Sequence, residues 1–466
     1  MSIYDPDTDH LHIKLFYFFR PQLAFKNFSN ALGFLYAIIG IMRKFFFNSQ
    51  YARNVFTLII GTSLAQFISI AFSPILTRLY SPEEFGLFAL FVAAIVISSV
   101  FVTGRYELAI MLPSRDRDAL HITIMAIMLS VVINLALLFV ILFVHTFTSL
   151  FDNSAIVYWL YWVPVSTLLL GIHQSLSYWS NRKSKYKRLS ISRAIQSTSS
   201  VLVQIGGGYA GIGAAGLISG QIAGQIVAIG VFGFLIWRED LKQIRTFNLK
   251  RSVALAKKYI NFPKYLIVAH GFNIASAQMP VLLLSALFNT KLAGFFTLSQ
   301  RVISAPIALI SGAIGDVFRQ EASYAYIHQG NCKEIYKKTF KRLLSISILP
   351  FAIFFFLAPE LFSFIFGEPW RAAGEYAKIL APMAFLQFIT SPLSSMFIIA
   401  EKQRLDLLWQ VFLVALVVIS FAIGKILSDP TLALILVSFS GCIAYILSGI
   451  MTYIFAKNKI NKRLKL

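Results

Sequence analysis

The feature that most constrains this chain is a series of twelve long apolar segments. A helix needs about 20 largely apolar residues to cross a bilayer, and each segment is rich in Leu, Ile, Val, Ala and Phe over about that length. None shows the alternation over about 10 residues that is typical of barrel strands. The chain is therefore predicted to be an all-α polytopic membrane protein. The predicted spans are residues 54–77, 84–103, 119–147, 154–179, 191–209, 213–237, 260–287, 291–318, 340–366, 376–398, 405–427 and 431–456.

Composition agrees with this class. Of the 466 residues, 57% are apolar and 13% charged, whereas globular domains average about 45–50% and about 25%. The net charge of +22 reflects 42 Lys and Arg against 20 Asp and Glu. In a soluble protein such an excess indicates nucleic acid. Here the basic residues fall in short loops between the apolar segments, so they are a topology signal and no nucleic-acid partner is predicted.

The basic residues lie mainly on one side of the predicted membrane. Alternate loops, together with both ends of the chain, hold 35 of the 42 Lys and Arg, whereas the opposite turns and adjacent helix ends hold five. Because Lys and Arg accumulate in cytoplasmic loops, both termini are predicted to be cytoplasmic. The outer connections are short and leave no room for a glycosyltransferase or polymerase domain. No phosphate-binding loop of the form G-x-x-x-x-G-K-[ST] occurs, so the chain alone is not expected to use ATP.

The chain is predicted to contain two sets of six helices. Residues 51–237 form the first bundle, residues 238–258 a basic cytoplasmic linker and residues 259–456 the second bundle. Residues 1–50 are read either as a cytoplasmic lead with an interfacial helix or as an over-long start, and residues 457–466 as a basic cytoplasmic tail.

The two predicted bundles share a sequence pattern. PILTRLYSPEEFGLFAL, which begins at Pro74, matches PVLLLSALFNTKLAGFFTL, which begins at Pro280, in its proline, its turn and its glycine. An even number of helices per repeat gives halves related by a pseudo-two-fold axis along the membrane normal, with substrate sites between them. Chance similarity of short apolar strings is the alternative.

The chain resembles the Wzx-type oligosaccharide-lipid flippases of the multidrug/oligosaccharidyl-lipid/polysaccharide (MOP) exporter superfamily. The resemblance rests on RNVFTLIIGTSLAQ from Arg53, PILTRLYSPEEFG from Pro74, RYELAIMLP from Arg105, AKKYINFPKY from Ala256 and GFFTLSQRVISAPIALISGAIGDVF from Gly294. It implies a carrier of the bacterial inner membrane that moves an undecaprenyl-diphosphate-linked oligosaccharide outward by alternating access through a cationic cavity. Such a carrier would serve O-antigen, capsule or exopolysaccharide assembly, with the polymerase and the chain-length regulator of that pathway as further possible partners beside membrane lipids.

Candidate substrate-binding residues are polar or cationic side chains inside the spans. A charge at a helix centre costs roughly 2.5–3.5 kcal/mol on insertion scales, so Arg301, ten residues into its span, is the strongest candidate. Its helix face continues through Ser304. The alternative is an arginine satisfied by helix-end carbonyls or a carboxylate, with the small residues of this face serving close packing. The other candidates, each with an anchoring, snorkelling or helix-packing alternative, are Arg78, Lys264, Gln66, Asn273 and Gln278.

Gating and coupling residues are sought among charges near the cytoplasmic ends of the spans. Arg105 and Glu107 are predicted to form a gate with Asp316 or Arg319, and a plain ion pair is the equal alternative. His270 and Asp316 are the titratable groups considered for coupling. Neither a cofactor nor a metal is expected; a coupling proton or sodium ion stays open. Flipping makes and breaks no bond, so the chain is predicted to be a transporter rather than an enzyme.

Two other functions compete with the flippase. A cation-coupled drug or metabolite antiporter of the same superfamily would favour carboxylates in the cavity, whereas the deepest charge here is Arg301. A membrane glycan polymerase would need a sizeable outer loop or an acidic catalytic pair, and the sequence offers neither. The sign of the intramembrane charge and the short loops both favour the flippase.

Overall fold

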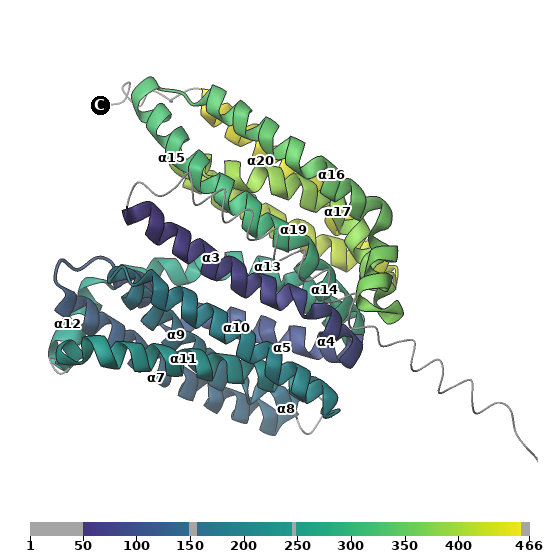
Figure 1. Ribbon diagram of the computed structural model, residues 1–466. Coiled ribbons are helices and arrows are strands. Elements are labelled where there is room, and N and C mark those ends of the chain that lie inside the picture. Colours follow the sequence, from purple (N-terminus) through teal and green to yellow (C-terminus); the bar gives the residue numbers. More distant parts are fainter. Residues whose placement is uncertain (1–49, 149–155, 245–247, 458–466) are drawn as a thin grey trace, which may run out of the picture. The chain divides into compact units, whose positions relative to one another are not determined.

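A computed structural model describes residues 50–148, 156–244 and 248–457, and the regular structure within these ranges is entirely helical (Figure 1). Residues 60–466 form one compact unit and residues 1–59 another, of which only the start of helix α3 is described. The predicted N-terminal lead and basic tail lie almost wholly outside the described residues. The all-α fold class is confirmed.

The first half of the chain contains six of the predicted spans. Two of them are broken: α3 is followed after Phe72 by α4, and α8 is separated from α9 by a short turn. Short helices that the sequence did not predict, α6 and α12, lie in two of the longer loops. The elements are α3 (Gln50–Ala71), α4 (Ser73–Leu79), α5 (Pro82–Val102), α6 (Tyr106–Ala109), α7 (Asp116–Thr148), α8 (Ile156–Leu160), α9 (Val163–Arg182), α10 (Tyr186–Tyr209), α11 (Ala214–Ile244) and α12 (Leu249–Lys258).

The second half contains the other six spans. Two of them include a π-helical turn, a local widening often found at functional sites. The elements are η1 (Phe262–Leu266), α13 (Ile267–Leu287), α14 (Thr290–Pro306), η2 (Ile307–Ser311), α15 (Gly312–Gln329), α16 (Lys333–Phe366), η3 (Glu368–Trp370), α17 (Arg371–Leu393), α18 (Met396–Ile399), α19 (Gln403–Ile426) and α20 (Pro430–Lys457).

Not all twelve predicted spans are equally apolar. Seven described helical stretches are long and apolar enough to cross a membrane, and the bent pair within η1 and α13 supplies an eighth. The other four predicted spans, which correspond to α3–α4, α8–α9, α10 and α14–α15, are helical but fall below that level. Three of these four carry the polar faces described below, which explains their lower hydropathy.

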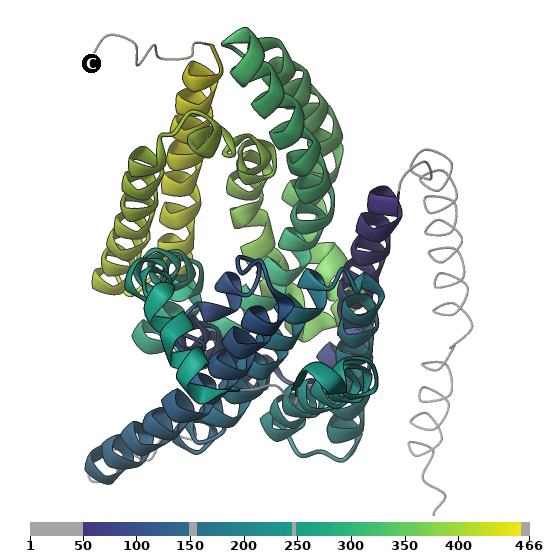
Figure 2. The same cartoon turned by 90° about the vertical axis from the view of Figure 1, so that its left-hand side faces the viewer.

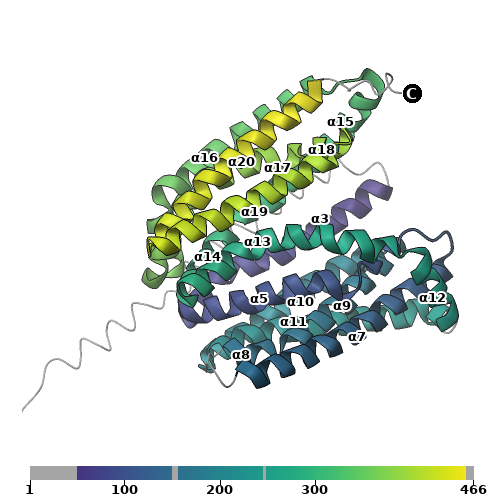
Figure 3. The same cartoon turned by 180° about the vertical axis from the view of Figure 1, so that it is seen from behind.

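Within residues 60–466, the helices of each half pack mainly against one another. In the first half α10 packs on α11 and α7 on α9; in the second, α16 packs on α17 and α19 on α20 (Figures 1 and 3). Contact between the halves is made mainly by α5, which packs against both α13 and α14, and α4 also contacts α16. In Figure 2 the green and yellow helices α16 to α20 lie together above the blue helices of the first half. This arrangement gives two helical lobes joined along α5, α13 and α14.

The lobes meet at a seam formed by the first turns of α5 and α14. A Cβ atom added to Gly86 would lie 1.9 Å from the carbonyl oxygen of Thr290, and one added to Gly294 would lie 2.0 Å from that of Pro82. Only glycine permits so close an approach of two backbones. Gly294 follows Gly86 by 208 residues, and Thr290 follows Pro82 by the same 208. The two contacts are therefore reciprocal, as pseudo-two-fold symmetry requires.

Matching caps start the two helices of the seam. Ser81 accepts a hydrogen bond from the backbone N–H of Glu84 at the start of α5, and Asn289 accepts one from Leu292 at the start of α14. Such caps satisfy N–H groups that have no partner within the helix. Because Ser81 and Asn289 are also 208 residues apart, the local signals that begin both helices repeat with the fold.

Aromatic side chains close the same end of the seam. The fully buried Trp370 ring lies edge-on to Phe85, with centroids 4.9 Å apart, and 6.0 Å from Phe295. Its Nε1 donates a hydrogen bond of 2.8 Å to the carbonyl oxygen of Thr77. At the rim, Lys291 Nζ lies 3.0 Å from Glu83 Oε1. The seam thus combines close backbone contact, buried aromatic packing and one exposed ion pair.

A buried polar cluster ties α9, α10 and α11 together. Arg188, whose side chain is 5% exposed, donates to Asp240 from Nη1 at 3.0 Å and to Glu239 from Nη2. Trp179 Nε1 donates to the same Asp240 oxygen at 3.1 Å. Arg188, one of the basic loop residues that indicate topology, therefore also holds helices together.

Asp240→Ala is expected to destabilise the fold by about 3 kcal/mol, because it leaves the buried Arg188 guanidinium short of one charged partner. The measurement is thermal unfolding of the purified protein in detergent. Lys185→Ala is the matched control, since Lys185 makes a half-exposed ion pair with Glu239, and exposed pairs contribute about 0–1 kcal/mol. Equal melting temperatures for the two variants would contradict a structural role for the cluster.

Candidate functional site: a cationic cavity

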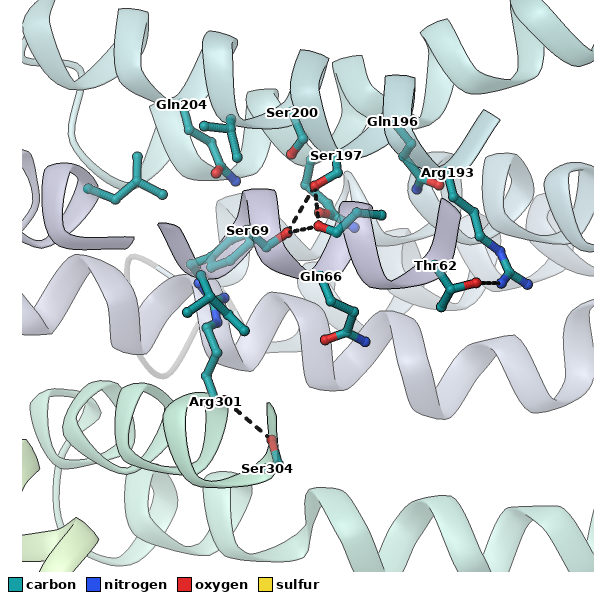
Figure 4. A pocket seen from close by; sticks show the side chains of 16 residues that line it. Thr62, Gln66, Ser69, Arg193, Gln196, Ser197, Ser200, Gln204, Arg301 and Ser304 are labelled. Atoms are coloured by element: carbon teal, nitrogen blue, oxygen red, sulfur yellow. Dashed lines mark hydrogen bonds between the residues drawn. The ribbon is translucent and has the colours of Figure 1, made fainter. Parts of the chain in front are cut away.

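A cavity of about 430 Å³ lies among α3, α10 and α14. Eleven of its sixteen lining residues are polar or charged, although it lies among membrane helices. The lining residues are Thr62, Ala65, Gln66, Ser69, Ile70, Leu76, Phe88, Arg193, Gln196, Ser197, Ser200, Val201, Gln204, Gln221, Arg301 and Ser304 (Figure 4). A polar cavity at this place requires polar faces on three helices that are otherwise apolar.

Helical spacing produces those faces. On α3 the polar positions are 62, 66 and 69, and on α10 they are 193, 196, 197, 200 and 204. Residues three or four apart lie on one side of a helix, so each set forms a continuous stripe. The stripes face each other: Ser69 and Ser197 hydroxyls lie 3.0 Å apart, and Ser197 also donates to the carbonyl oxygen of Ala65 at 2.8 Å.

Arg301 enters the cavity from α14. Figure 4 shows its side chain extending from α14 toward α3. The guanidinium forms no ion pair or hydrogen bond with another side chain among the described residues. The dashed line at Arg301 in Figure 4 is a bond of 3.4 Å from the Ser304 hydroxyl to the backbone carbonyl of Arg301. Five N–H donors on a permanently charged group are therefore available to a ligand in the cavity.

Arg193 supplies a second cation from α10. Its Nη1 donates a hydrogen bond to the Thr62 hydroxyl on α3. This contact holds the guanidinium at one end of the cavity without neutralising its charge, because a hydroxyl is an uncharged acceptor. No carboxylate is among the residues that line the cavity, so both arginines keep a positive field there.

Such a cavity is suited to an anion with several oxygens. Guanidinium groups bind phosphate oxygens through paired, charge-assisted hydrogen bonds, and these are stronger than neutral ones. Serine hydroxyls and glutamine amides along α3 and α10 can both donate and accept hydrogen bonds. The wall thus offers charge for a phosphate and neutral polar groups for hydroxyls.

Three of the seven predicted binding residues line this cavity, namely Arg301, Gln66 and Ser304. Three others lie elsewhere: Arg78 is exposed on α4, Gln278 is half-buried on α13, and exposed Lys264 in η1 has its ammonium 5.4 Å from the ring centroid of Tyr265. None of these three lines the cavity in this conformation. The side chain of Asn273 lies outside the described residues.

The predicted gating residues pair within each half. Arg105 and Glu107 are buried and lie 3.4 Å apart, and the Thr103 hydroxyl also donates to Glu107. Asp316 and Arg319, one turn apart on α15, lie 3.9 Å apart and are exposed. No contact between the two pairs occurs in the described part of the chain, so the predicted inter-half gate is not formed in this conformation. His270 is exposed on α13.

The polar stripe of α10 was missed by the sequence interpretation. The sequence predicts a membrane span over residues 191–209 but no polar face on it. The signal that could have found the stripe is the spacing 193, 196, 200 and 204 on one face. In addition, no group of His, Cys, Asp and Glu suited to a metal ion occurs in the described ranges.

The chain is similar to known proteins in sequence and in fold. A family model described as "Polysaccharide biosynthesis protein" matches residues 75–375. No curated protein matches the chain. A multidrug resistance MATE family transporter of the MOP superfamily, in an inward-facing conformation, is similar in structure, with a TM-score of 0.65 and 14% identity over 85% of this chain and 94% of that one.

Two further solved structures share the fold. The lipid II flippase MurJ, in an inward closed conformation, has a TM-score of 0.64 and 14% identity, covering 84% of this chain and 86% of that one. A MOP superfamily transporter from Pyrococcus furiosus Vc1 has a TM-score of 0.59 and 14% identity, covering 85% and 95%. The chain therefore has the two-lobed fold of these transporters and is a multi-pass membrane protein.

Proposed function

The chain belongs to the polysaccharide biosynthesis protein family, and we propose that it is a flippase for an undecaprenyl-diphosphate-linked oligosaccharide. In this proposal it moves the oligosaccharide from the cytoplasmic to the periplasmic leaflet of the bacterial inner membrane. The observation that carries the proposal is the pair of arginines, Arg193 and Arg301, in a cavity without a lining carboxylate. A lipid II flippase among the structures of the same fold supports a lipid-linked substrate.

The two arginines lower the cost of moving the charged diphosphate across the membrane. A diphosphate carries negative charge that hydrocarbon does not solvate, whereas the guanidinium of Arg301 faces the cavity and has no side-chain partner in the described ranges. Binding the diphosphate there would replace water by charge-assisted hydrogen bonds. The polyprenyl chain is already compatible with lipid and needs no polar site. The carrier therefore needs to bind and release, and no step requires a covalent change.

Alternating access gives the seam a role. The charge distribution of the loops predicts that the α4–α5 turn faces the periplasm. In this orientation, the close contact of Gly86 with Thr290 and of Gly294 with Pro82 closes the outer end of the passage. The described conformation would then receive substrate from the cytoplasmic side. Opening of the seam would expose the cavity to the periplasm, with both chain termini remaining cytoplasmic.

The antiporter alternative is less well supported, because the lining of this cavity has cations and no carboxylate. A proton or sodium ion as the coupling species remains a prediction, as do contacts with the polymerase and chain-length regulator of the same assembly pathway. The coupling ion concerns the energy source of transport, and the partner proteins concern the later use of the glycan. Neither changes the proposed substrate class.

The test is the sidedness of the lipid-linked glycan in cells that lack the gene. Sealed inner-membrane vesicles of known orientation are treated with a membrane-impermeant sugar oxidant. Complete repeat units accumulated on the cytoplasmic face, and restored outside by the wild-type gene, are the expected result. Normal outer exposure of unpolymerised units would instead indicate a polymerase. Unchanged glycans would favour the antiporter.

A further inference from the structure

A second cavity, of about 460 Å³, lies in the other half of the chain among α13, α14, α17, α19 and α20. It is distinct from the cationic cavity, since the two share no lining residue. Its polar wall includes Gln300, Gln387, Gln410, Asp406 and Ser391. No Lys or Arg is among its lining residues. A cavity of this size inside a membrane bundle with so many polar groups needs a polar occupant.

The wall combines fixed aromatic rings with two glutamine amides, those of Gln300 and Gln387. Trp409 and Tyr445 both line the cavity, with ring centroids 5.7 Å apart, and Trp409 Nε1 is held by a 2.8 Å hydrogen bond to the carbonyl oxygen of Ala444. The amides of Gln300 and Gln387 form no hydrogen bond with another residue of the described ranges. Each amide can donate two hydrogen bonds and accept two.

The sign of the charge separates the two cavities. The cationic cavity has two arginines and no carboxylate, whereas the second cavity has Asp406 and no cation. An anion therefore prefers the first, and a neutral ligand rich in hydroxyl groups is accommodated by the second, where a carboxylate and glutamines can accept its hydrogen bonds. Sugar rings also present C–H faces that pack on aromatic side chains, as ligand sites with a few convergent polar groups commonly do.

One helix serves both cavities. Gln300 and Arg301 are consecutive on α14, and consecutive helical residues point about 100° apart. Arg301 lines the cationic cavity and Gln300 lines the second. A ligand with a diphosphate at one end and sugars attached to it could thus occupy both cavities at once, on the two sides of α14.

The second cavity also continues toward the first turns of α15, at the inner end of the predicted span 291–318. A further cavity, again of about 460 Å³, shares Ser391, Ser394 and Asp406 with it and extends to Asp316 and Arg319. The charge distribution of the loops predicts that this end is cytoplasmic. Sugars added in the cytoplasm could enter along this route.

We propose that the second cavity binds the glycan of the substrate, whereas the cationic cavity binds its diphosphate. This inference rests on the proposed function and adds a specificity site to it. Gln300, Gln387 and Asp406 supply the hydrogen bonds, and Trp409 and Tyr445 supply the packing surface. In this proposal the second half of the chain selects among glycans. The two arginines bind the diphosphate, which all such lipids share.

The test compares two probes on the purified full-length protein in nanodiscs. One probe is undecaprenyl diphosphate, and the other is the lipid-linked oligosaccharide extracted from cells that lack the gene. Wild type should bind the oligosaccharide lipid more tightly. Gln387→Leu removes a neutral hydrogen-bonding group, so it should weaken binding of the glycosylated probe about 3- to 10-fold and leave binding of undecaprenyl diphosphate unchanged.

Two control variants separate the possible failures. Gln403→Leu, at an exposed position of α19 outside both cavities, should bind as wild type does. Arg301→Ala should weaken both probes. Equal weakening of both probes by Gln387→Leu, or no weakening, would overturn the glycan site while leaving the flippase proposal intact. Failure of the wild type to bind either probe would overturn both.

Discussion

Arg301→Ala is expected to abolish surface glycan while the amount of protein in the membrane stays normal. The guanidinium faces the cavity and pairs with no side chain of the described helices, so its removal leaves none of those side chains without a partner. A hydrogen bond to a charged group contributes about 1.5–3 kcal/mol, equivalent to about 10- to 150-fold in binding. Surface glycan measured by immunoblot or phage sensitivity, against membrane abundance by western blot, provides the readout.

Three further variants sharpen this result. Arg301→Lys should retain part of the activity if a positive charge suffices; a loss as large as that of alanine would show that guanidinium geometry matters. Arg193→Ala should also reduce transport, because Arg193 is the second cation of the cavity. Arg78→Ala is the matched control, since Arg78 is exposed on α4 and lines no part of the cavity. Loss of abundance in Arg301→Ala would show that Arg301 is structural.

Gly86→Ala should hold the transporter open at its outer end. The added methyl would lie 1.9 Å from the carbonyl oxygen of Thr290, so the seam could close only after a backbone shift. Overpacking of this kind costs about 1–3 kcal/mol, which corresponds to about a 5- to 150-fold change in the equilibrium between closed and open forms. Transport should fall accordingly, and Gly294→Ala should act in the same way.

A cysteine in the cavity reports the position of the seam. In a Gln66→Cys, Cys442→Ala background, Gly86→Ala should raise the reaction with an impermeant maleimide added to the periplasmic side. Burial raises the pKa of the Cys332 thiol to about 11, so this native cysteine adds little background at neutral pH. Gly230→Ala is the control, because a Cβ at Gly230 has no atom within 4 Å. Equal labelling of both variants would contradict the gating role of the seam.

The sequence was sufficient to predict the helices but not their assembly. Every predicted span corresponds to helix in the described ranges, because long apolar runs identify helices without reference to neighbours. α6 and α12 were missed, since short helices in basic loops carry no such signal. The breaks after α3 and before α9 were missed as well, because hydropathy does not register the direction of a helix.

For the candidate site, too, the sequence predicts single helix faces but not how they come together. The polar stripes of α3 and α14 gave Gln66, Arg301 and Ser304 by helical spacing, and these three residues line the cavity. Periodicity reveals that a helix has a polar face but not which faces meet, so the sequence does not predict that Arg193 of α10 and Arg301 of α14 line one cavity. Arg78 and Lys264 illustrate the converse, since depth along a helix does not fix the direction in which a side chain points.

The ion pair at the seam depends on the two halves being parts of one chain. Glu83 and Lys291, which pair across the seam, are separated by the same 208 residues as Gly86 and Gly294, so they occupy equivalent positions of the two halves. In a symmetric dimer of identical chains, a residue beside the axis faces its own copy. Such a dimer would set two glutamates or two lysines against each other there. Covalent linkage lets the two copies diverge, and attraction between unlike charges becomes possible at a place where a homodimer can have only repulsion or neutrality.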